Sequence, residues 1–318
     1  MADCHSSFKG FYEEIKLAPA KKVFLRTSRD AVRKKIKKYF KEELEEEVPK
    51  FRGQGSYSMD TIVNPLDGEY DIDDGVYLSN LDSDKSKWPS AETAHNWVFE
   101  AVKGHTDTDP VDKRTCVRVI YAGQYHVDLP IYGIHNNTIY LAEKGKTEWT
   151  LSDPKAITDW FLDQVKSKGE QLRRVVRYLK AWADNKSQKM PSGLVLTILA
   201  SNNFVSNQRD DIAFTETVRN IYNQLLVSTA ILNPVDITED LSGGISKSQM
   251  NNFKDMLSKL IERADKAIKE DDEDKACELW TKEFGNRFSC NKEDKKSRNN
   301  KDVATPIIIS NGAKPWAK

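Results

Sequence analysis

Gly53–Leu78 reads GQGSYSMDTIVNPLDGEYDIDDGVYL and contains two features about a strand's length apart. The first is the tight turn Gly53-Gln54-Gly55-Ser56, and the second is the alternating run Tyr70-Asp71-Ile72-Asp73. Because successive side chains of a strand point to opposite faces, Asp71 and Asp73 lie on one face. Two neighbouring carboxylates repel each other unless a positive charge lies between them, and a glycine-serine turn presents backbone N–H groups to a phosphate. The stretch therefore predicts a site for a divalent metal and a phosphate.

Length and composition limit the class of protein. The chain has 318 residues, enough for two lobes, and its 38% hydrophobic and 31% charged residues are ordinary for a globular protein. Basic and acidic residues number 49 each, so the net charge of zero gives no overall attraction to nucleic acid or an anionic membrane. No run reaches the length of a membrane span, and the N-terminus lacks the apolar core of a signal peptide. We expect a cytoplasmic protein with no membrane partner.

The four cysteines are scattered, with no pair at metal-ligand spacing. They are Cys4, Cys116, Cys277 and Cys290. Cysteines of this kind in a cytoplasmic protein are most often reduced and buried. We therefore expect free thiols rather than zinc ligands or disulfides.

The first half of the chain mixes helix and strand patterns. Residues 1–20 show no sustained period and predict a short helix or loop at the surface. Ser28 is a candidate N-cap for a helix that runs to about Glu47. Its basic face indicates an ordinary solvated helix, because the acidic last turns would repel nucleic-acid phosphates. The remaining expected elements are a helix over 91–102, strands over 116–121, 125–132 and 138–142, and turns at 64–68 and 122–124.

From the proline helix start at Asp153-Pro154 onward, the pattern changes from strands to helices. Apolar residues recur at spacings of three and four, which is typical of amphipathic helices. The expected helices cover 156–168, 170–186, 192–203, 211–228, 246–270 and 272–288. Residues 291–302 (NKEDKKSRNNKD) lack apolar side chains and indicate disorder. We expect a core lobe over 1–155, a helical lobe over 156–290 and a flexible tail over 291–318.

A third carboxylate on a later strand would complete a two-metal site. Asp128, in His126-Val127-Asp128-Leu129, alternates with apolar neighbours, where a charge without a partner is costly. Asp74 flanks the acidic pair but points to the opposite face of the strand. Alone, Asp71-Ile72-Asp73 fits an exposed strand face equally well, and glycine-serine turns are common. The order and spacing of all three features together are much more specific.

This order is the pattern of polymerase-beta-type nucleotidyltransferases, and the chain resembles one branch of them. Gln54-Gly55-Ser56, Tyr70–Leu78 and Val127-Asp128-Leu129-Pro130 are similar to motifs of the bacterial cGAS/DncV-like nucleotidyltransferases (CD-NTases). These relatives of cyclic GMP-AMP synthase make cyclic oligonucleotides in the CBASS systems of anti-phage signalling.

The second half of the chain carries further likeness to this family. LRRVVRYLKAW at 172–182 resembles its central helix, and Pro191-Ser192-Gly193 resembles the start of the next helix. WTKEFG at 280–285 resembles its closing helix. The resemblance covers roughly residues 25–288.

The resemblance implies an α+β fold of two lobes. One is a polymerase-beta-like nucleotidyltransferase core, with a mixed sheet and a long N-terminal helix, and the other is a C-terminal helical bundle that closes over the nucleotide. It implies an enzyme that makes a cyclic di- or trinucleotide second messenger from ATP, with GTP or a pyrimidine nucleotide as further substrates. The rival interpretations are a linear oligonucleotide synthase, a tRNA-type nucleotidyltransferase, and a catalytically inactive nucleotide-binding scaffold.

The resemblance also implies a role for each acid. Asp71 and Asp73 would hold two Mg²⁺ ions, with Mn²⁺ as the alternative ion, and Asp128 would complete the site. A ribose hydroxyl would then attack the α-phosphate in line and release pyrophosphate.

Residues outside the acidic set would hold the triphosphate. Gly55 and Ser56 would clamp the β- and γ-phosphates, and Gln54 would orient their turn. Lys180 and Ser192 would reach the same phosphates from the helical lobe. The plainer interpretations are an exposed lysine at Lys180 and a helix N-cap at Ser192.

The expected partners follow from the same resemblance. The animal enzyme grips DNA with a zinc ribbon, and the chain has no compact Cys/His cluster, so direct activation by duplex DNA is not expected. A downstream effector would respond only to the product. In some operons of the family a ubiquitin-transfer-like regulator acts on the C-terminus, although this chain ends in Lys318 where that pattern has glycine or alanine.

Overall fold

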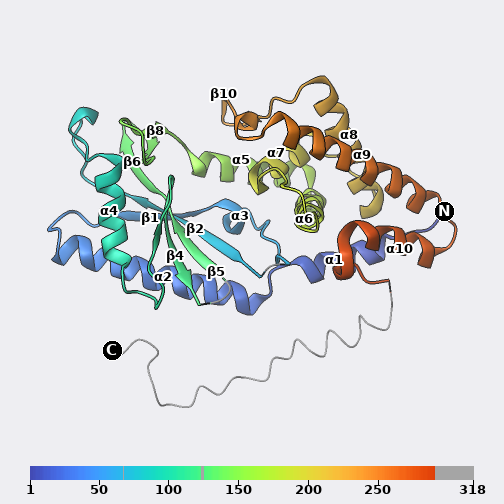
Figure 1. Ribbon diagram of the computed structural model, residues 1–318, viewed down its shortest axis with the longest axis horizontal. Helices are drawn as coiled ribbons and strands as arrows, with labels where there is room; N and C mark the ends of the chain where they lie inside the picture. Colours follow the sequence, from blue (N-terminus) through green and yellow to red (C-terminus); the bar gives the residue numbers. More distant parts are fainter. Residues whose placement is uncertain (67, 123–124, 291–318) are drawn as a thin grey trace, which may run out of the picture.

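The computed structural model describes residues 1–66, 68–122 and 125–290 (Figure 1). The predicted turns at 64–68 and 122–124 fall partly outside these residues, and the predicted tail at 291–318 falls wholly outside them. The described residues form two lobes, each around its own large hydrophobic core. One lobe is a mixed sheet with helices and the other is a helical bundle, which confirms the predicted α+β fold.

A mixed sheet of eight strands is the frame of the first lobe in the described residues. Strand order is β3-β4-β5-β2-β6-β7-β8, with β1 paired to β2. The strands are β1 Lys50–Gln54, β2 Tyr70–Tyr77, β3 Val111–Asp112, β4 Val117–Tyr121, β5 Tyr125–Leu129, β6 Ile131–His135, β7 Thr138–Leu141 and β8 Thr150–Leu151. β5 and β6 pair with β2 in parallel and in one register, separated only by Pro130. Strand β2 thus has β1 as an antiparallel neighbour and β5, which carries Asp128, as a parallel neighbour.

Two helices, α2 (Pro19–Glu42) and α4 (Ala91–Val102), pack against this sheet (Figure 1). The predicted start of the first of them at Ser28 is wrong. The helix begins at Pro19, because proline at the first helical position has its φ preset and needs no hydrogen bond from its nitrogen. Ser28 lies inside the helix instead, where its Oγ bonds the hydroxyl of Tyr125 (2.9 Å).

The charged face of α2 is only partly solvated. Arg33 turns toward the sheet, where its Nε donates to Asp74 Oδ2 (2.6 Å) and its Nη2 to the other oxygen (2.5 Å). The Asp74 side chain is fully buried. This ion pair fastens α2 to the face of β2 opposite Asp71 and Asp73.

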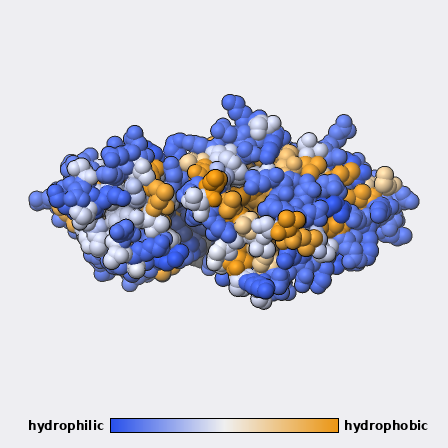
Figure 2. Space-filling model, turned by 90° about the horizontal axis from the view of Figure 1, so that it is seen from above, coloured by the Kyte–Doolittle hydropathy of each residue, from blue (hydrophilic) through white to orange (hydrophobic). Residues whose placement is uncertain are grey.

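The helical lobe matches the predicted helix order closely. Its helices are α5 Pro154–Lys168, α6 Glu170–Asp184, α7 Gly193–Asn202, α8 Asp210–Val227, α9 Lys247–Lys269 and α10 Glu273–Phe284. A small hairpin of β9 (Leu232–Asn233) and β10 (Asp236–Asp240) projects from it. The visible face of this lobe carries several apolar patches, whereas the sheet lobe is mostly hydrophilic in the same view (Figure 2). Within the described ranges, no helix is both long and apolar enough to cross a membrane.

The N-terminal helix α1 (His5–Ile15) packs into this helical lobe, so the predicted short helix is confirmed but its predicted surface position is wrong. Phe8, Phe11 and Ile15 are buried in the helical core. The Phe8 ring lies 4.8 Å from the Trp280 ring, measured between centroids. These apolar side chains share one helix face at spacings of three and four, but the pattern is too short to stand out in the sequence.

One face of α6 holds the two lobes together. Its side chains at 173, 177, 180 and 184 contact the segment 59–66, which leads from the turn to β2. The contacts are Arg173 to the Met59 carbonyl, Arg177 Nη2 to Asp60 Oδ1 (2.8 Å), Lys180 Nζ to Thr61 Oγ1 (2.9 Å) and the Leu66 N–H to Asp184 Oδ2 (3.1 Å). Residues at these spacings lie along one stripe of a helix, so α6 carries a continuous row of polar contacts.

The cysteine prediction is wrong for one pair. A disulfide joins Cys277 to Cys290, with the two Cα atoms 5.6 Å apart. The chain turns back after α10 and brings them together, which their spacing of 13 residues does not reveal. Cys4 and Cys116 are free and buried in the described structure, as expected.

Candidate active site

Polar side chains form one straight row across four neighbouring strands. Gln54 of β1 is the register partner of Asp73 of β2, Asp73 that of Asp128 of β5, and Asp128 that of Arg118 of β4. Directly paired residues project from the same face of a sheet. Asp71 lies two residues from Asp73 and shares that face. The structure therefore places the three predicted acids on one face of the sheet, with an arginine at the end of their row.

The surroundings of the two acids of β2 disfavour their ionised forms. Burial raises the pKa of Asp71, and the charge of Asp128 raises it further. Burial likewise raises the pKa of Asp73 well above its ordinary value, with added effect from Asp71 and Asp128. Both shifts have the sign that a bound cation would reverse, because a positive charge favours the ionised carboxylates.

Asp128 differs from this pair because it has a cationic partner. Arg118 Nε donates to Asp128 Oδ1 (2.7 Å) and Nη2 donates to Oδ2 (2.6 Å), so both carboxylate oxygens are engaged. Among the described residues, no three Asp, Glu, His or Cys side chains converge as a ready set of metal ligands. Oxygen ligands and unneutralised charge make Asp71 and Asp73 fit a divalent ion. At Asp128, by contrast, the guanidinium of Arg118 already binds the oxygens that a metal would use.

The glycine-serine turn closes over the acidic row. Gly55 opens the short helix α3 (Gly55–Ser58) with a φ of +68°, which L side chains rarely adopt. A Cβ at Gly55 would lie 2.0 Å from Asp73 Oδ2, so only glycine allows the backbone to approach this carboxylate. Gln54 Nε2 donates to the Tyr132 hydroxyl (2.9 Å), a contact that suits the predicted role in orienting the turn.

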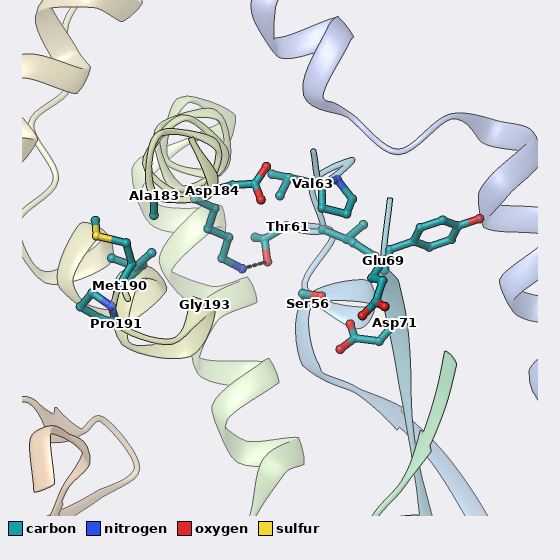
Figure 3. Close-up of a pocket in the computed structure, with 15 residues that line it drawn as sticks. Ser56, Thr61, Val63, Glu69, Asp71, Ala183, Asp184, Met190, Pro191 and Gly193 are labelled. Atoms are coloured by element: carbon teal, nitrogen blue, oxygen red, sulfur yellow. Dashed lines mark hydrogen bonds between the residues drawn. The ribbon is translucent and has the colours of Figure 1, made fainter. Parts of the chain in front are cut away.

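A cleft of about 410 Å³ lies between the turn and the two acids of β2 on one side and the helical lobe on the other. Its lining comprises Gln54, Gly55, Ser56, Met59, Asp71, Asp73, Pro154, Ile157, Lys180, Gly193, Leu194 and Thr197. A second hollow of about 330 Å³ shares Ser56, Asp71 and Lys180 with it. In Figure 3, Ser56 and Asp71 lie across this hollow from Met190 and Pro191. The site therefore has one wall from each lobe.

Lys180 is the cationic group of the helical wall. Its Nζ donates to Thr61 Oγ1 (2.9 Å), which is the dashed line of Figure 3. Burial lowers its pKa to about 7, and the nearby charge of Arg177 adds to that effect. Lys180 is thus not an ordinary exposed lysine, and it lines the cleft beside both acids of β2.

Ser192 is placed differently. Its Oγ accepts a hydrogen bond from the Val195 N–H (3.3 Å) and caps the N-terminus of α7, the plainer of its two interpretations. It lines a separate hollow with Lys189 and Gln249 rather than the cleft of the acids. A phosphate-binding role for Ser192 stays a prediction.

Sequence reasoning missed two polar residues of the site. Arg118 alternates with Val117 and Val119, the same signal of a charge within an apolar strand that identified Asp128. Thr61 gave no signal, because its role depends on the position of Lys180, which is distant in the chain.

Comparison with known proteins adds sequence relationships to this geometry. The family model "Cyclic GMP-AMP synthase DncV-like, nucleotidyltransferase domain" matches residues 49–132. The model "Cyclic GMP-AMP synthase, C-terminal domain" matches residues 169–297. The first match contains the turn and all three acids, and the second contains Lys180.

Individual relatives agree with the family models. A cyclic GMP-AMP synthase of Escherichia albertii is 31% identical over 65% of this chain and 49% of its own length. A cyclic AMP-AMP-AMP synthase of Acinetobacter sp. is 28% identical over 51% of this chain and 50% of its own. The chain thus spans about half the length of the curated relatives it matches.

The fold is shared with a solved structure. The crystal structure of Vibrio cholerae DncV cyclic AMP-GMP synthase superimposes with a TM-score of 0.77 at 20% identity. The match covers 91% of this chain and 98% of that one, so both lobes are shared. The two family models together span more than half of the 318 residues and describe two parts of one kind of protein. The chain belongs to the DncV-like nucleotidyltransferase family.

Proposed function

We propose that this protein is a cyclic oligonucleotide synthase. It would join nucleoside triphosphates into a cyclic di- or trinucleotide second messenger and release pyrophosphate. The observation that carries this proposal is the position of Asp71 and Asp73 beside the Gly55 turn in the cleft that Lys180 also lines, with Asp128 in register next to Asp73. The names of the relatives, cyclic GMP-AMP synthase and cyclic AMP-AMP-AMP synthase, support the choice of product class.

Two Mg²⁺ ions, or Mn²⁺ in their place, are the proposed cofactors. When bound, they supply positive charge to the attacking and leaving oxygens. Asp71 and Asp73 would hold them, with Asp128 as a third ligand. Arg118 lies within hydrogen-bond distance of Asp128, whereas Asp71 and Asp73 have raised pKa values. The metal-binding role therefore suits Asp71 and Asp73.

The remaining residues of the cleft would bind and orient the donor triphosphate. The Gly55 turn and the Ser56 hydroxyl offer hydrogen-bond donors next to the acids. Lys180 would neutralise phosphate charge from the opposite wall, and a bound triphosphate would favour its protonated form. Orientation of the phosphate chain aligns the scissile bond with the attacking hydroxyl, which is the main task of the protein in phosphoryl transfer.

ATP is the first proposed substrate, with GTP or a pyrimidine nucleotide as the second. Solved structures of the Vibrio cholerae protein include one in complex with nonhydrolyzable GTP and a mutant in complex with ATP and GTP. We place the reaction in the cytoplasm and in anti-phage signalling, where a downstream effector would read the product. A ubiquitin-transfer-like regulator would act on the C-terminal residues, which lie outside the described structure.

The test is incubation of the full chain with radiolabelled nucleoside triphosphates and Mg²⁺, followed by phosphatase treatment and chromatography. A phosphatase-resistant product is expected, because a ring has no terminal phosphate. A phosphatase-sensitive oligonucleotide would show a linear synthase instead, and the absence of any product would contradict the proposal. Asp71→Asn should remove the product, whereas Asp236→Asn, on the distant hairpin, serves as the matched control.

A further inference from the structure

The ion pair between Arg118 and Asp128 occupies one of the three proposed metal ligands. It lies in register across β4 and β5 and uses both carboxylate oxygens. Its side chains are 18% and 10% exposed, so the pair is shielded from most of the surrounding water. Shielding strengthens the attraction between the two charges relative to an exposed pair.

A divalent ion and this guanidinium are competitors for the same carboxylate. A cation bound by Asp71, Asp73 and Asp128 together would lie close to the positive charge of Arg118. Two positive charges at such separations repel each other strongly in a partly buried site. The guanidinium of Arg118 already donates to both oxygens of Asp128. Arg118 thus already supplies part of the neutralisation that a metal would bring.

We propose that Arg118 is a positioning residue that holds Asp128 back from metal binding until a nucleotide is bound. Without nucleotide, a divalent ion would be held by Asp71 and Asp73 alone, and weakly. An incoming triphosphate adds oxygen ligands for the metal and a second bidentate acceptor for the guanidinium, since phosphate accepts the same pair of N–H bonds as carboxylate. Full metal loading would then follow nucleotide binding. This inference rests on the proposed function.

The test is a titration of the full chain with Mn²⁺ in the absence of nucleotide, with free Mn²⁺ followed by electron paramagnetic resonance. Arg118→Gln should bind Mn²⁺ about tenfold more tightly than the wild type, because one competing positive charge is removed. Arg118→Lys should lie between them, since it keeps the charge but not the fork. Arg219→Gln is the matched control: it removes an ion-paired arginine (2.6 Å to Asp265) far from the cleft and should leave the affinity unchanged.

Two further variants separate the possible outcomes. Asp128→Asn in the Arg118→Gln background should abolish the gain, because the released carboxylate is its source. If Arg118→Gln binds Mn²⁺ no better than the wild type while Asp73→Asn weakens binding, this inference is wrong and the proposed metal site stands. If Asp73→Asn leaves Mn²⁺ binding unchanged, both the inference and the proposed metal site are overturned. Circular dichroism shows whether each variant is folded.

Discussion

The two faces of strand β2 carry acidic side chains with opposite surroundings. On one face, Asp74 is fully buried and paired with Arg33, and it fastens a helix to the sheet. On the other, Asp71 and Asp73 lie in a cleft, and burial together with the charges of neighbouring acids raises their pKa values. The residue type and strand are the same, so the neighbours decide the role. A charge neutralised within the protein serves stability, whereas a charge that lacks neutralisation is available for a ligand.

The sharpest test of this contrast is the same substitution on each face. Asp73→Asn should lower product formation on the order of a thousandfold, because the metals and the transition-state charge lose a ligand. Asp74→Asn should leave the activity of the folded fraction largely intact. Radiolabelled product formation per folded molecule measures both. Equal losses of activity would show that the two faces do not differ in function.

The next largest effect concerns the two arginines. Arg33→Gln leaves Asp74 buried without its cation and should lower the free energy of unfolding by about 3 kcal/mol. Arg118→Gln should cost less, because the side chain of Asp128 is 10% exposed and can regain water, whereas that of Asp74 is fully buried. Urea unfolding of both variants measures the difference. Restoration of stability by Asp74→Asn in the Arg33→Gln background would confirm the cause, and equal costs for the two arginines would contradict the contrast.

A pH dependence distinguishes the cleft face in metal-free protein. The pKa of Asp73 is raised by folding above its ordinary value of 3.8, so the carboxyl binds its proton more tightly in the folded state. The stability linked to that proton is present below the unfolded pKa and is lost as the pH rises through the folded pKa. The wild-type Tm should therefore fall relative to that of Asp73→Asn as the pH rises above about 4. Mg²⁺ should reduce the gap, and a constant gap would contradict the electrostatic cause.

The smallest effect separates two serines near the nucleotide site. Ser192→Ala should lower stability by about 1 kcal/mol, because the N-cap of α7 is lost. Its KM for ATP should stay close to that of the wild type if the hydroxyl only caps the helix. Ser56→Ala should raise that KM with little change in stability. Thermal melts and substrate titrations measure the two quantities, and a raised KM for Ser192→Ala would support its predicted phosphate role.

Much of the fold could be predicted because its signals are local. Asp153-Pro154 marked the start of α5 correctly, since a cap and a preset φ act within one turn. Ser28 failed as a cap because Pro19 begins the same helix earlier. The burial of α1 and the disulfide between Cys277 and Cys290 were missed, since both depend on segments that meet only after folding.

The site likewise contains residues that local patterns predicted and residues whose roles depend on distant segments. Alternation along the strands was enough to place Asp71 and Asp73 on one face and to single out Asp128. The environment of Lys180, with its bond to Thr61 and its lowered pKa, could not be predicted, because residues 119 positions apart in the chain create it. Arg118 carried the same local signal as Asp128, yet its partner followed only from the pairing of β4 with β5.

By itself, the sequence determined which side chains share a face, because strand and helix periods are properties of a short stretch of chain. It therefore determined the acidic pair of β2 and the class of site. The tertiary structure alone decided which of these charges would be neutralised. Arg33 reaches Asp74 and Arg118 reaches Asp128, while Asp71 and Asp73 meet the cleft. Neutralisation depends on distances between segments far apart in the chain, and only the folded packing sets those distances.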